Sequence, residues 1–195
     1  MIAAPVFRFD EARHEYELDG VRLPSITQLI SLGGLVNGEA YFTEASRNRG
    51  TAIHAMTANF DLGVDLGEQL QSSPLRGYVL AYMAAVDALK PTWECIEEAD
   101  YSARYRFAGR TDRIGMVFGK RTVCEIKSAV KAAHHSVQTS LQSILAAENR
   151  RMPNVSAEKW QRLTIYLKPT GKYSIDRHED RRDFDVAQTL ISRFC

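Results

Sequence analysis

Residues 106–127 constrain the fold of this chain more than any other segment. Two β-rich stretches lie there, one around Asp112 and one that ends at Lys127, and both are rich in aromatic and β-branched residues. Gly119-Lys120 lies between them and is a turn signal. The segment therefore predicts a β-hairpin.

Charged side chains of this hairpin are expected to gather on one face. Side chains alternate along a strand, so Glu125 and Lys127 share a face and Ile126 points to the other. An antiparallel neighbour can bring Asp112 to the face of Glu125. Two carboxylates and an ammonium would then converge, and such oxygen-rich sites suit Mg²⁺ or Mn²⁺. The alternative is a solvated face, where an exposed Glu–Lys pair contributes only ~0–1 kcal/mol.

Composition predicts one ordinary folded domain. The chain has 195 residues, of which 45% are hydrophobic and 25% charged. We expect a single domain over 1–195, with an N-terminal hairpin and helices in 1–91, the core in 92–177 and a C-terminal helix in 178–195. The net charge of +1 gives no global basic signal, so a nucleic-acid surface would have to be local.

Cysteine usage and hydropathy bear on the compartment. The three cysteines are widely spaced and form no Cys-x-x-Cys pair, which argues against a disulfide framework or a zinc site and favours a reducing cytoplasm. No apolar run approaches ~18 residues, so we expect no membrane span. The N-terminus lacks the pattern of a signal peptide.

Hydrophobic periodicity places further elements around the hairpin. Ser25, with Gln28 three residues on, is the expected N-cap of a short helix. The other expected elements are strands at 7–9 and 16–23, the second bent at Asp19-Gly20, a long helix at 39–62, a polar loop at 61–73, a helix at 75–89, a strand at 92–102, a helix at 134–149, a second hairpin with strands at 162–168 and 172–175, and a helix at 184–194.

The long helix carries a polar face beside its apolar stripe. Arg47, Gly50 and His54 line up there at i, i+3 and i+7. A glycine inside a helix costs ~1 kcal/mol against alanine, which suggests a packing or close-approach reason for Gly50. His54 can be read as a functional group or as a hydrogen-bonded histidine at the edge of the core.

Five short motifs occur in order along residues 22–175. They are Leu23-Pro-Ser-Ile-Thr, Arg49-Gly-Thr-Ala-Ile-His54, Gly109-Arg-Thr-Asp112, Glu125-Ile-Lys127 and a helical glutamine, Gln138. Together they resemble the PD-(D/E)XK nuclease superfamily, and more narrowly its RecB-like branch with the phage and mitochondrial-genome-maintenance exonucleases. One departure is Gln142, which stands where the family's Gln-x-x-x-Tyr helix has its tyrosine. Its loss would remove a stacking contact of ~1–3 kcal/mol per base.

The resemblance implies a fold and a metal site. The expected fold is α/β with a restriction-endonuclease-like core, a mixed central sheet flanked by helices, to which an N-terminal β-hairpin and helices are added. His54, Asp112, Glu125 and the backbone carbonyl of Ile126 would hold Mg²⁺ or Mn²⁺, and Lys127 would orient the attacking water and stabilise the transition state. Too few cysteines are present for the iron–sulfur cluster of some relatives.

Other charged residues are candidates for supporting roles. Either Glu97 or Glu98 would assist a second metal ion, because strand alternation keeps both from facing the site. The arginines suit phosphate contacts, although each can equally be a solvated or salt-bridged surface residue. The candidates for contact with nucleic acid are Arg47, Arg49, Arg110, Gln138 and Gln142.

The resemblance further implies a metal-dependent deoxyribonuclease, an exonuclease on DNA ends or single-stranded DNA in a bacterial or phage-infected cell. One alternative is a catalytically silent nuclease fold that binds DNA or protein. Another is a coincidence of motifs on an unrelated α/β domain, which would be supported if His54 lay far from Asp112.

Overall fold

The computed structural model describes residues 5–36, 43–128, 130–149 and 156–195. The strands are β1 (Phe7–Asp10), β2 (Glu15–Leu18), β3 (Val21–Leu23), β4 (Thr92–Ser102), β5 (Phe107–Val117), β6 (Lys120–Lys127), β7 (Gln161–Leu167) and β8 (Tyr173–Arg177). The helices are α1 (Ile26–Leu32), α2 (Glu44–Asp61), α3 (Gly67–Ser72), α4 (Arg76–Leu89), α5 (His134–Asn149) and α6 (Arg182–Phe194), with a 3₁₀ turn at Ala157–Lys159.

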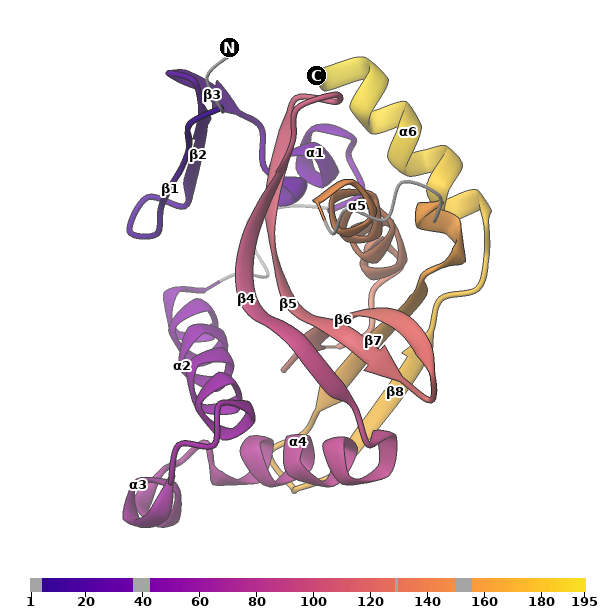
Figure 1. The fold of residues 1–195 in the computed structure, drawn as a ribbon. Coiled ribbons are helices and arrows are strands. Elements are labelled where there is room, and N and C mark those ends of the chain that lie inside the picture. The colour runs from indigo at the N-terminus through magenta and orange to yellow at the C-terminus, as the bar shows by residue number, and fades with distance from the viewer. Residues whose placement is uncertain (1–4, 37–42, 129, 150–155) are drawn as a thin grey trace.

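The predicted α/β class with a mixed central sheet is confirmed (Figure 1). The main sheet has the order β4-β5-β6-β7-β8, and its β6–β7 pair is parallel whereas the other pairs are antiparallel. A parallel pair needs a crossover connection, which contains α5. A separate antiparallel sheet, β1-β2-β3, precedes it. Among the described residues, no helix is long and apolar enough to cross a membrane.

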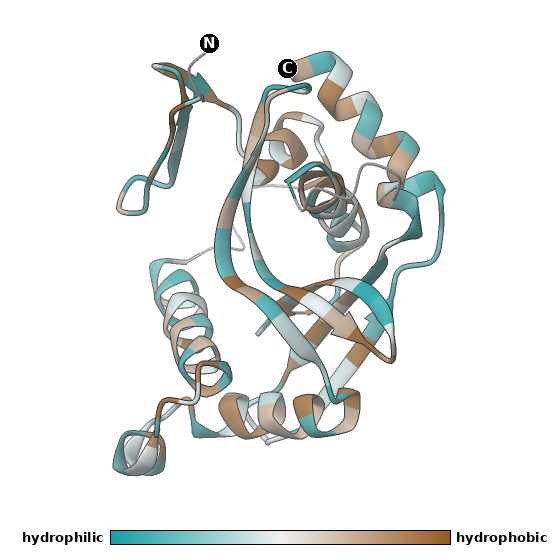
Figure 2. Ribbon diagram, in the orientation of Figure 1, coloured by the Kyte–Doolittle hydropathy of each residue, from teal (hydrophilic) through white to brown (hydrophobic). Residues whose placement is uncertain are grey.

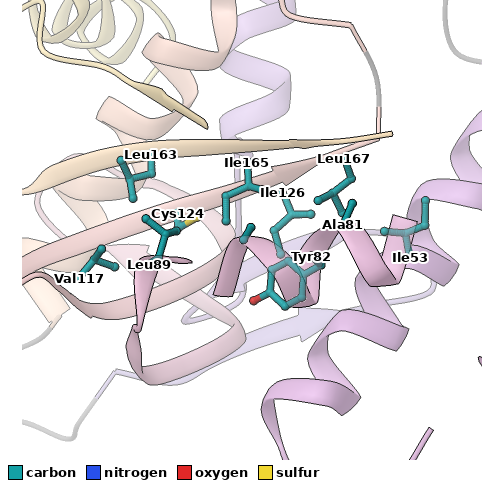
Figure 3. Close-up of a cluster of buried hydrophobic side chains, with 11 residues drawn as sticks. Ile53, Ala81, Tyr82, Leu89, Val117, Cys124, Ile126, Leu163, Ile165 and Leu167 are labelled. Carbon is teal, nitrogen blue, oxygen red and sulfur yellow. The ribbon is translucent and has the colours of Figure 1, made fainter. Parts of the chain in front are cut away.

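Helices cover both faces of the main sheet. On one face, alternate residues of β6 and β7, such as Ile126 and Ile165, pack against Tyr82 of α4 and Ile53 of α2 (Figure 3). On the other face lies α5, which packs with α1 and α6. Hydrophobic and hydrophilic residues alternate along α6, as expected for a helix with one face on the core (Figure 2). The burial of Ile53 holds α2 against the sheet and so places the next residue, His54.

Most expected elements occur, with three differences. The long helix begins at Glu44, because Thr43 has an extended backbone and caps it; the predicted start at 39 lies outside the described residues. The polar loop expected at 61–73 contains the short helix α3, which no apolar periodicity announces. The hairpin turn is Phe118-Gly119, one residue earlier than predicted, and both residues have positive φ, as type I′ turns require.

The capping box predicted at the start of α1 is confirmed. The Ser25 side chain accepts a hydrogen bond from the Gln28 backbone N–H at 3.1 Å, and the Gln28 side chain accepts one from the Ser25 backbone at 2.8 Å. Two donors that the helix itself leaves unpaired are thereby satisfied.

Two helical glycines give a matched test of packing. A Cβ atom at Gly77 in α4 would lie 1.7 Å from the carbonyl oxygen of Pro169, whereas one at Gly50 in α2 meets no described atom within 4 Å. The packing reason expected for Gly50 is thus not found among the described residues. We predict that Gly77→Ala lowers the free energy of unfolding by about 1–3 kcal/mol. Gly50→Ala should raise it by ~0.5–1 kcal/mol. Urea denaturation of both variants checks this, and equal effects would contradict the close approach of α4 to Pro169.

Candidate metal centre

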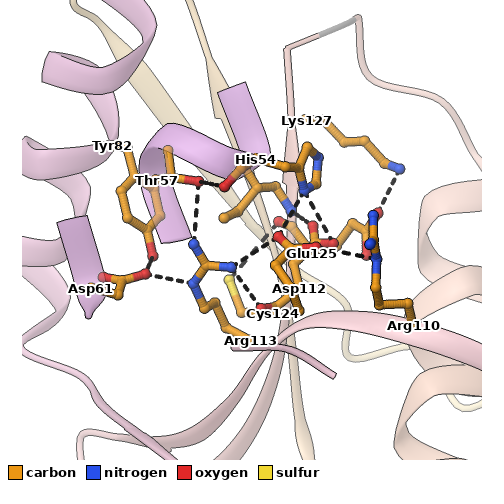
Figure 4. A network of polar contacts seen from close by, with 12 residues as sticks. His54, Thr57, Asp61, Tyr82, Arg110, Asp112, Arg113, Cys124, Glu125 and Lys127 are labelled. Carbon is orange, nitrogen blue, oxygen red and sulfur yellow. Dashed lines mark hydrogen bonds and ion pairs between the residues drawn. The ribbon is translucent and has the colours of Figure 1, made fainter. Parts of the chain in front are cut away.

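Three side chains from three elements converge where α2, β4 and β5 meet, and Figure 4 shows two of them, His54 and Asp112. The Nδ1 atom of His54, from α2, lies 3.0 Å from Oε1 of Glu97, from β4, and 3.3 Å from Oδ1 of Asp112, from β5. One potential ligand atom from each residue lies within 4.8 Å of the others. An imidazole nitrogen and two carboxylate oxygens form a donor set that could hold a divalent cation.

Strand pairing brings Glu97 and Asp112 together. The residues on either side of Glu97 pair with those on either side of Asp112, so the two acids lie opposite each other on β4 and β5. Glu97 itself has a φ of 53°, in the left-handed region. Such a conformation costs a non-glycine residue of order 1–3 kcal/mol and persists only where the surroundings impose it. The backbone strain therefore falls on a residue whose carboxylate faces His54.

The electrostatics of this point favour positive charge. Burial alone would lower the pKa of His54, but the carboxylates of Asp112 and Glu97 outweigh burial and raise this pKa to about 10. For Glu97 the directions are reversed: burial alone would raise its pKa, but His54 and the neighbouring arginines lower it below its ordinary value. Glu97 thus stays ionised, and the point attracts a cation, either a proton on His54 or a metal ion.

Glu125 lies outside this cluster of described residues and is occupied by donors. Its Oε1 accepts hydrogen bonds from Lys127 Nζ at 2.6 Å and from Gln138 Nε2 at 2.7 Å, and its Oε2 accepts one from Gln142 Nε2 at 2.6 Å. The carboxylate is 4% exposed, so this is not the solvated Glu–Lys pair of the alternative interpretation. The metal-ligand role predicted for Glu125 stays a prediction that would require its release from these donors.

Asp112 and Lys127 connect the two groups of residues. The backbone N–H of Ile126 donates to Oδ2 of Asp112 at 2.6 Å, which ties Asp112 to the strand of Glu125. Burial would lower the pKa of Lys127, but Glu125 and Asp112 raise it, so the ammonium is kept charged. The role predicted for the carbonyl of Ile126 stays a prediction.

The expected nucleic-acid contacts differ in accessibility. Arg47 and Arg49 are exposed on α2, on the N-terminal side of His54. Arg110 lies beside the centre, with its Nε 3.4 Å from Oε2 of Glu97. Gln142 has no exposed surface, so the contact with nucleic acid predicted for it does not fit this conformation. Its amide donates to Glu125 instead. Gln138 and Gln142 are four residues apart and so lie on the same side of the helix, which allows both amides to reach Glu125.

Two further observations concern residues that sequence reasoning left open or missed. Of the two candidate glutamates, Glu97 joins the cluster and Glu98 is exposed on the other side of the strand. Arg113, which no motif singled out, is fully buried and donates to Glu97. The sequence around Arg113 does not indicate that it is buried, because the helix that covers this face of β5 comes from a distant part of the chain.

No protein-family model matches the chain, and a search of curated proteins finds no significant match.

A buried histidine outside the cluster, His135, gives a pH prediction. His135 on α5 accepts from the Ala132 backbone N–H, its Nδ1 lies 2.8 Å from the Tyr166 hydroxyl, and burial, then Lys127, lowers its pKa to about 3. The unfolded chain therefore takes up a proton near pH 6.5 that the native state refuses, so stability falls between pH 6.5 and 3, by at most ~1.4 kcal/mol per pH unit. His135→Gln should flatten this part of the stability profile in urea titrations; parallel profiles would contradict the buried neutral imidazole.

Metal binding by this cluster can be tested without any substrate. We predict that Glu97→Gln weakens Mn²⁺ binding by at least ~10–100-fold, the loss typical even for partners outside the ligand set. Glu98→Gln, one residue away and exposed, is the matched control and should bind like the wild type. Isothermal titration calorimetry measures both, and equal affinities of the two variants would remove Glu97 from the centre.

Proposed function

We propose that this protein is a metal-dependent deoxyribonuclease, an exonuclease that acts on DNA ends or single-stranded DNA. The observation that carries the proposal is the convergence of His54 on Asp112, with 3.3 Å between Nδ1 and Oδ1. These residues belong to two separate motifs of the sequence and come from different elements. A large separation would have supported the interpretation as an unrelated domain, and the short distance removes that support.

The residues fit a divalent cation such as Mg²⁺ or Mn²⁺. Oε2 of Glu97 is buried and accepts no hydrogen bond within the described residues, although Arg110 lies nearby. A buried carboxylate oxygen of this kind is costly unless a cation or a donor completes it. His54, Glu97 and Asp112 would hold the ion. When bound, it would supply Lewis-acid activation of water and of the scissile phosphate.

The remaining polar residues support hydrolysis of a phosphodiester. Lys127 keeps its positive charge beside Glu125 and is 23% exposed, so its ammonium can orient a water molecule and stabilise negative charge on the phosphate. Gln138 and Gln142 fix the Glu125 carboxylate and thereby the position of Lys127. In the reaction a water oxygen bonds to phosphorus, the phosphorus–oxygen ester bond breaks, and the leaving oxygen takes a proton.

Substrate contacts would come from local positive charge, since the chain as a whole carries only +1. Arg47 is exposed and lies two turns before His54 on the same helix, and Arg110 stands beside Glu97. Guanidinium groups bind phosphate in a bidentate manner, which suits a nucleic-acid backbone that passes the metal centre.

One observation favours a second candidate, a nuclease fold that binds nucleic acid without cutting it. Glu125, which the resemblance implies as a metal ligand, is engaged by three donors and lies outside the cluster of His54, Glu97 and Asp112. If these contacts persist when DNA binds, the centre would lack one carboxylate for catalysis.

A cleavage assay decides between the two functions. End-labelled single- and double-stranded DNA, linear and circular, is incubated with protein and Mg²⁺, Mn²⁺ or EDTA. We predict that only linear DNA is degraded, and only with metal. Asp112→Asn should lose at least ~100-fold in rate, because Asp112 is placed in the ligand set itself. Asp87→Asn, an exposed acid on α4 paired with Lys90, is the matched control and should keep full activity.

The other outcomes are equally informative. Metal-dependent cutting of circular DNA would overturn the exonuclease assignment, but metal-dependent hydrolysis of phosphodiester bonds would stand. DNA binding without cutting would favour the silent module. Full activity of Asp112→Asn would show that the cluster is not the active site.

A further inference from the structure

Arg113 is the largest fully buried side chain of the described residues. Arginine is almost never buried completely unless it is paired, because an unpaired charge in the interior costs several kcal/mol. Its position is therefore explained only by the groups that it contacts. The face of β5 that carries it is covered by α4, and the guanidinium lies 5.5 Å from the centre of the Tyr82 ring.

The guanidinium of Arg113 contacts the elements that carry all three proposed ligands (Figure 4). Its Nη1 donates to Oε1 of Glu97 at 3.1 Å and to the backbone carbonyl of Asp112 at 2.6 Å. Its Nη2 donates to Oγ1 of Thr57 at 3.2 Å, and Thr57 in turn donates to the backbone carbonyl of His54 at 3.0 Å. One planar group thus fixes the carboxylate of one ligand and the backbone of another, and is joined to the helical turn of the third.

The charge of Arg113 is balanced on the side away from the centre. Its Nε donates to Oδ2 of Asp61 at 2.5 Å, and the side chain of Asp61 is 3% exposed. The Tyr82 hydroxyl donates to the same oxygen at 2.6 Å. Because Asp61 is closer to the guanidinium than Glu97 is, Arg113 and Asp61 act as a nearly neutral pair. Repulsion of a metal ion by Arg113 is therefore small, and the geometric effect of its hydrogen bonds dominates.

Glu97 needs such a support more than the other ligands do. Its left-handed backbone would relax to an extended strand if nothing held the side chain. Arg113 and His54 both contact its Oε1, from opposite elements.

We propose that Arg113 is a positioning residue of the metal centre, which keeps Glu97 in register with Asp112 and His54. The proposal rests on the metal centre of the proposed function but not on nuclease activity. The hydrogen bonds that Arg113 donates from Nη1 and Nη2, here called the fork, would determine the shape of the ligand set, and its charge would not.

The test compares geometry with charge. Arg113→Lys keeps the charge but cannot donate from three nitrogens in one plane. We expect it to weaken Mn²⁺ binding by ~10–100-fold in calorimetric titrations, as is typical when a partner that orients ligands is lost. Titrations are made at a temperature where circular dichroism shows each variant fully folded. Binding as tight as the wild type would overturn the proposal, because charge alone would then suffice.

A second pair of variants keeps the test decisive if Arg113→Lys does not fold. Thr57→Val has nearly the same shape but removes the acceptor for Nη2 and the link to His54, so it should also weaken Mn²⁺ binding. Tyr82→Phe removes a buried hydrogen bond from the same network without touching the fork, so its affinity should match the wild type. Equal affinities for both variants would overturn the proposal, whether both match the wild type or both are weakened.

The outcome also separates this inference from the proposed function. If the wild type binds Mn²⁺ and the fork variants bind it equally well, the positioning role fails and the metal centre stands. If the wild type itself binds no Mn²⁺, the metal centre is overturned, and the positioning role with it.

Discussion

The structure depends on an excess of buried negative charge where α2, β4 and β5 meet. Carboxylates cannot stay ionised in the interior unless cations or hydrogen-bond donors surround them. The permanent cations there, within the part of the chain that the structure describes, are Arg110, Arg113 and Lys127, and the four acids around them outnumber them by one. His54 becomes a strong base for this reason. The acids concerned are Asp61, Glu97, Asp112 and Glu125. Helix α2 brings its imidazole to this point, where a proton on His54, or a metal ion that the cluster could hold, supplies the remaining positive charge.

The site consists of two halves that the sheet topology joins. One half is the cluster of His54, Glu97 and Asp112 at the β4–β5 pair. The other is Glu125 with its three donors, and it exists because the crossover from β6 to the parallel strand β7 runs through α5 and lays two glutamines over the strand. Among the described residues, the hydrogen bond from the Ile126 backbone to Asp112 connects them. The pairing of β5 with β6 ends at Arg113 and Cys124, and Asp112 and Glu125 lie just beyond it.

Local patterns predicted much of this arrangement, and tertiary contacts determined the rest. Period-two and helical spacing gave β4 and α5 with their observed bounds, although α5 proves to be buried on almost every side. Alternation reduced Glu97 and Glu98 to one candidate without choosing between them, since the choice depends on the position of α2. Arg113 and Gln142 could not be foreseen as buried, because each looks like a surface residue until α4 or β6 covers it. The short helix α3 has no buried residue and so leaves no apolar signal.

The burial of these charges is itself an argument about function. An ion pair in the interior contributes little to stability, since desolvation offsets most of its attraction, and apolar residues of the same volume often serve the fold as well or better. A chain selected only to fold would have little reason to place the Arg113–Asp61 pair and the Lys127–Glu125 pair beside a strained Glu97. Concentrated charge, perturbed pKa values and backbone strain in one place are typical of functional sites. The fold therefore gives up stability here, and the metal centre that we propose would account for this cost.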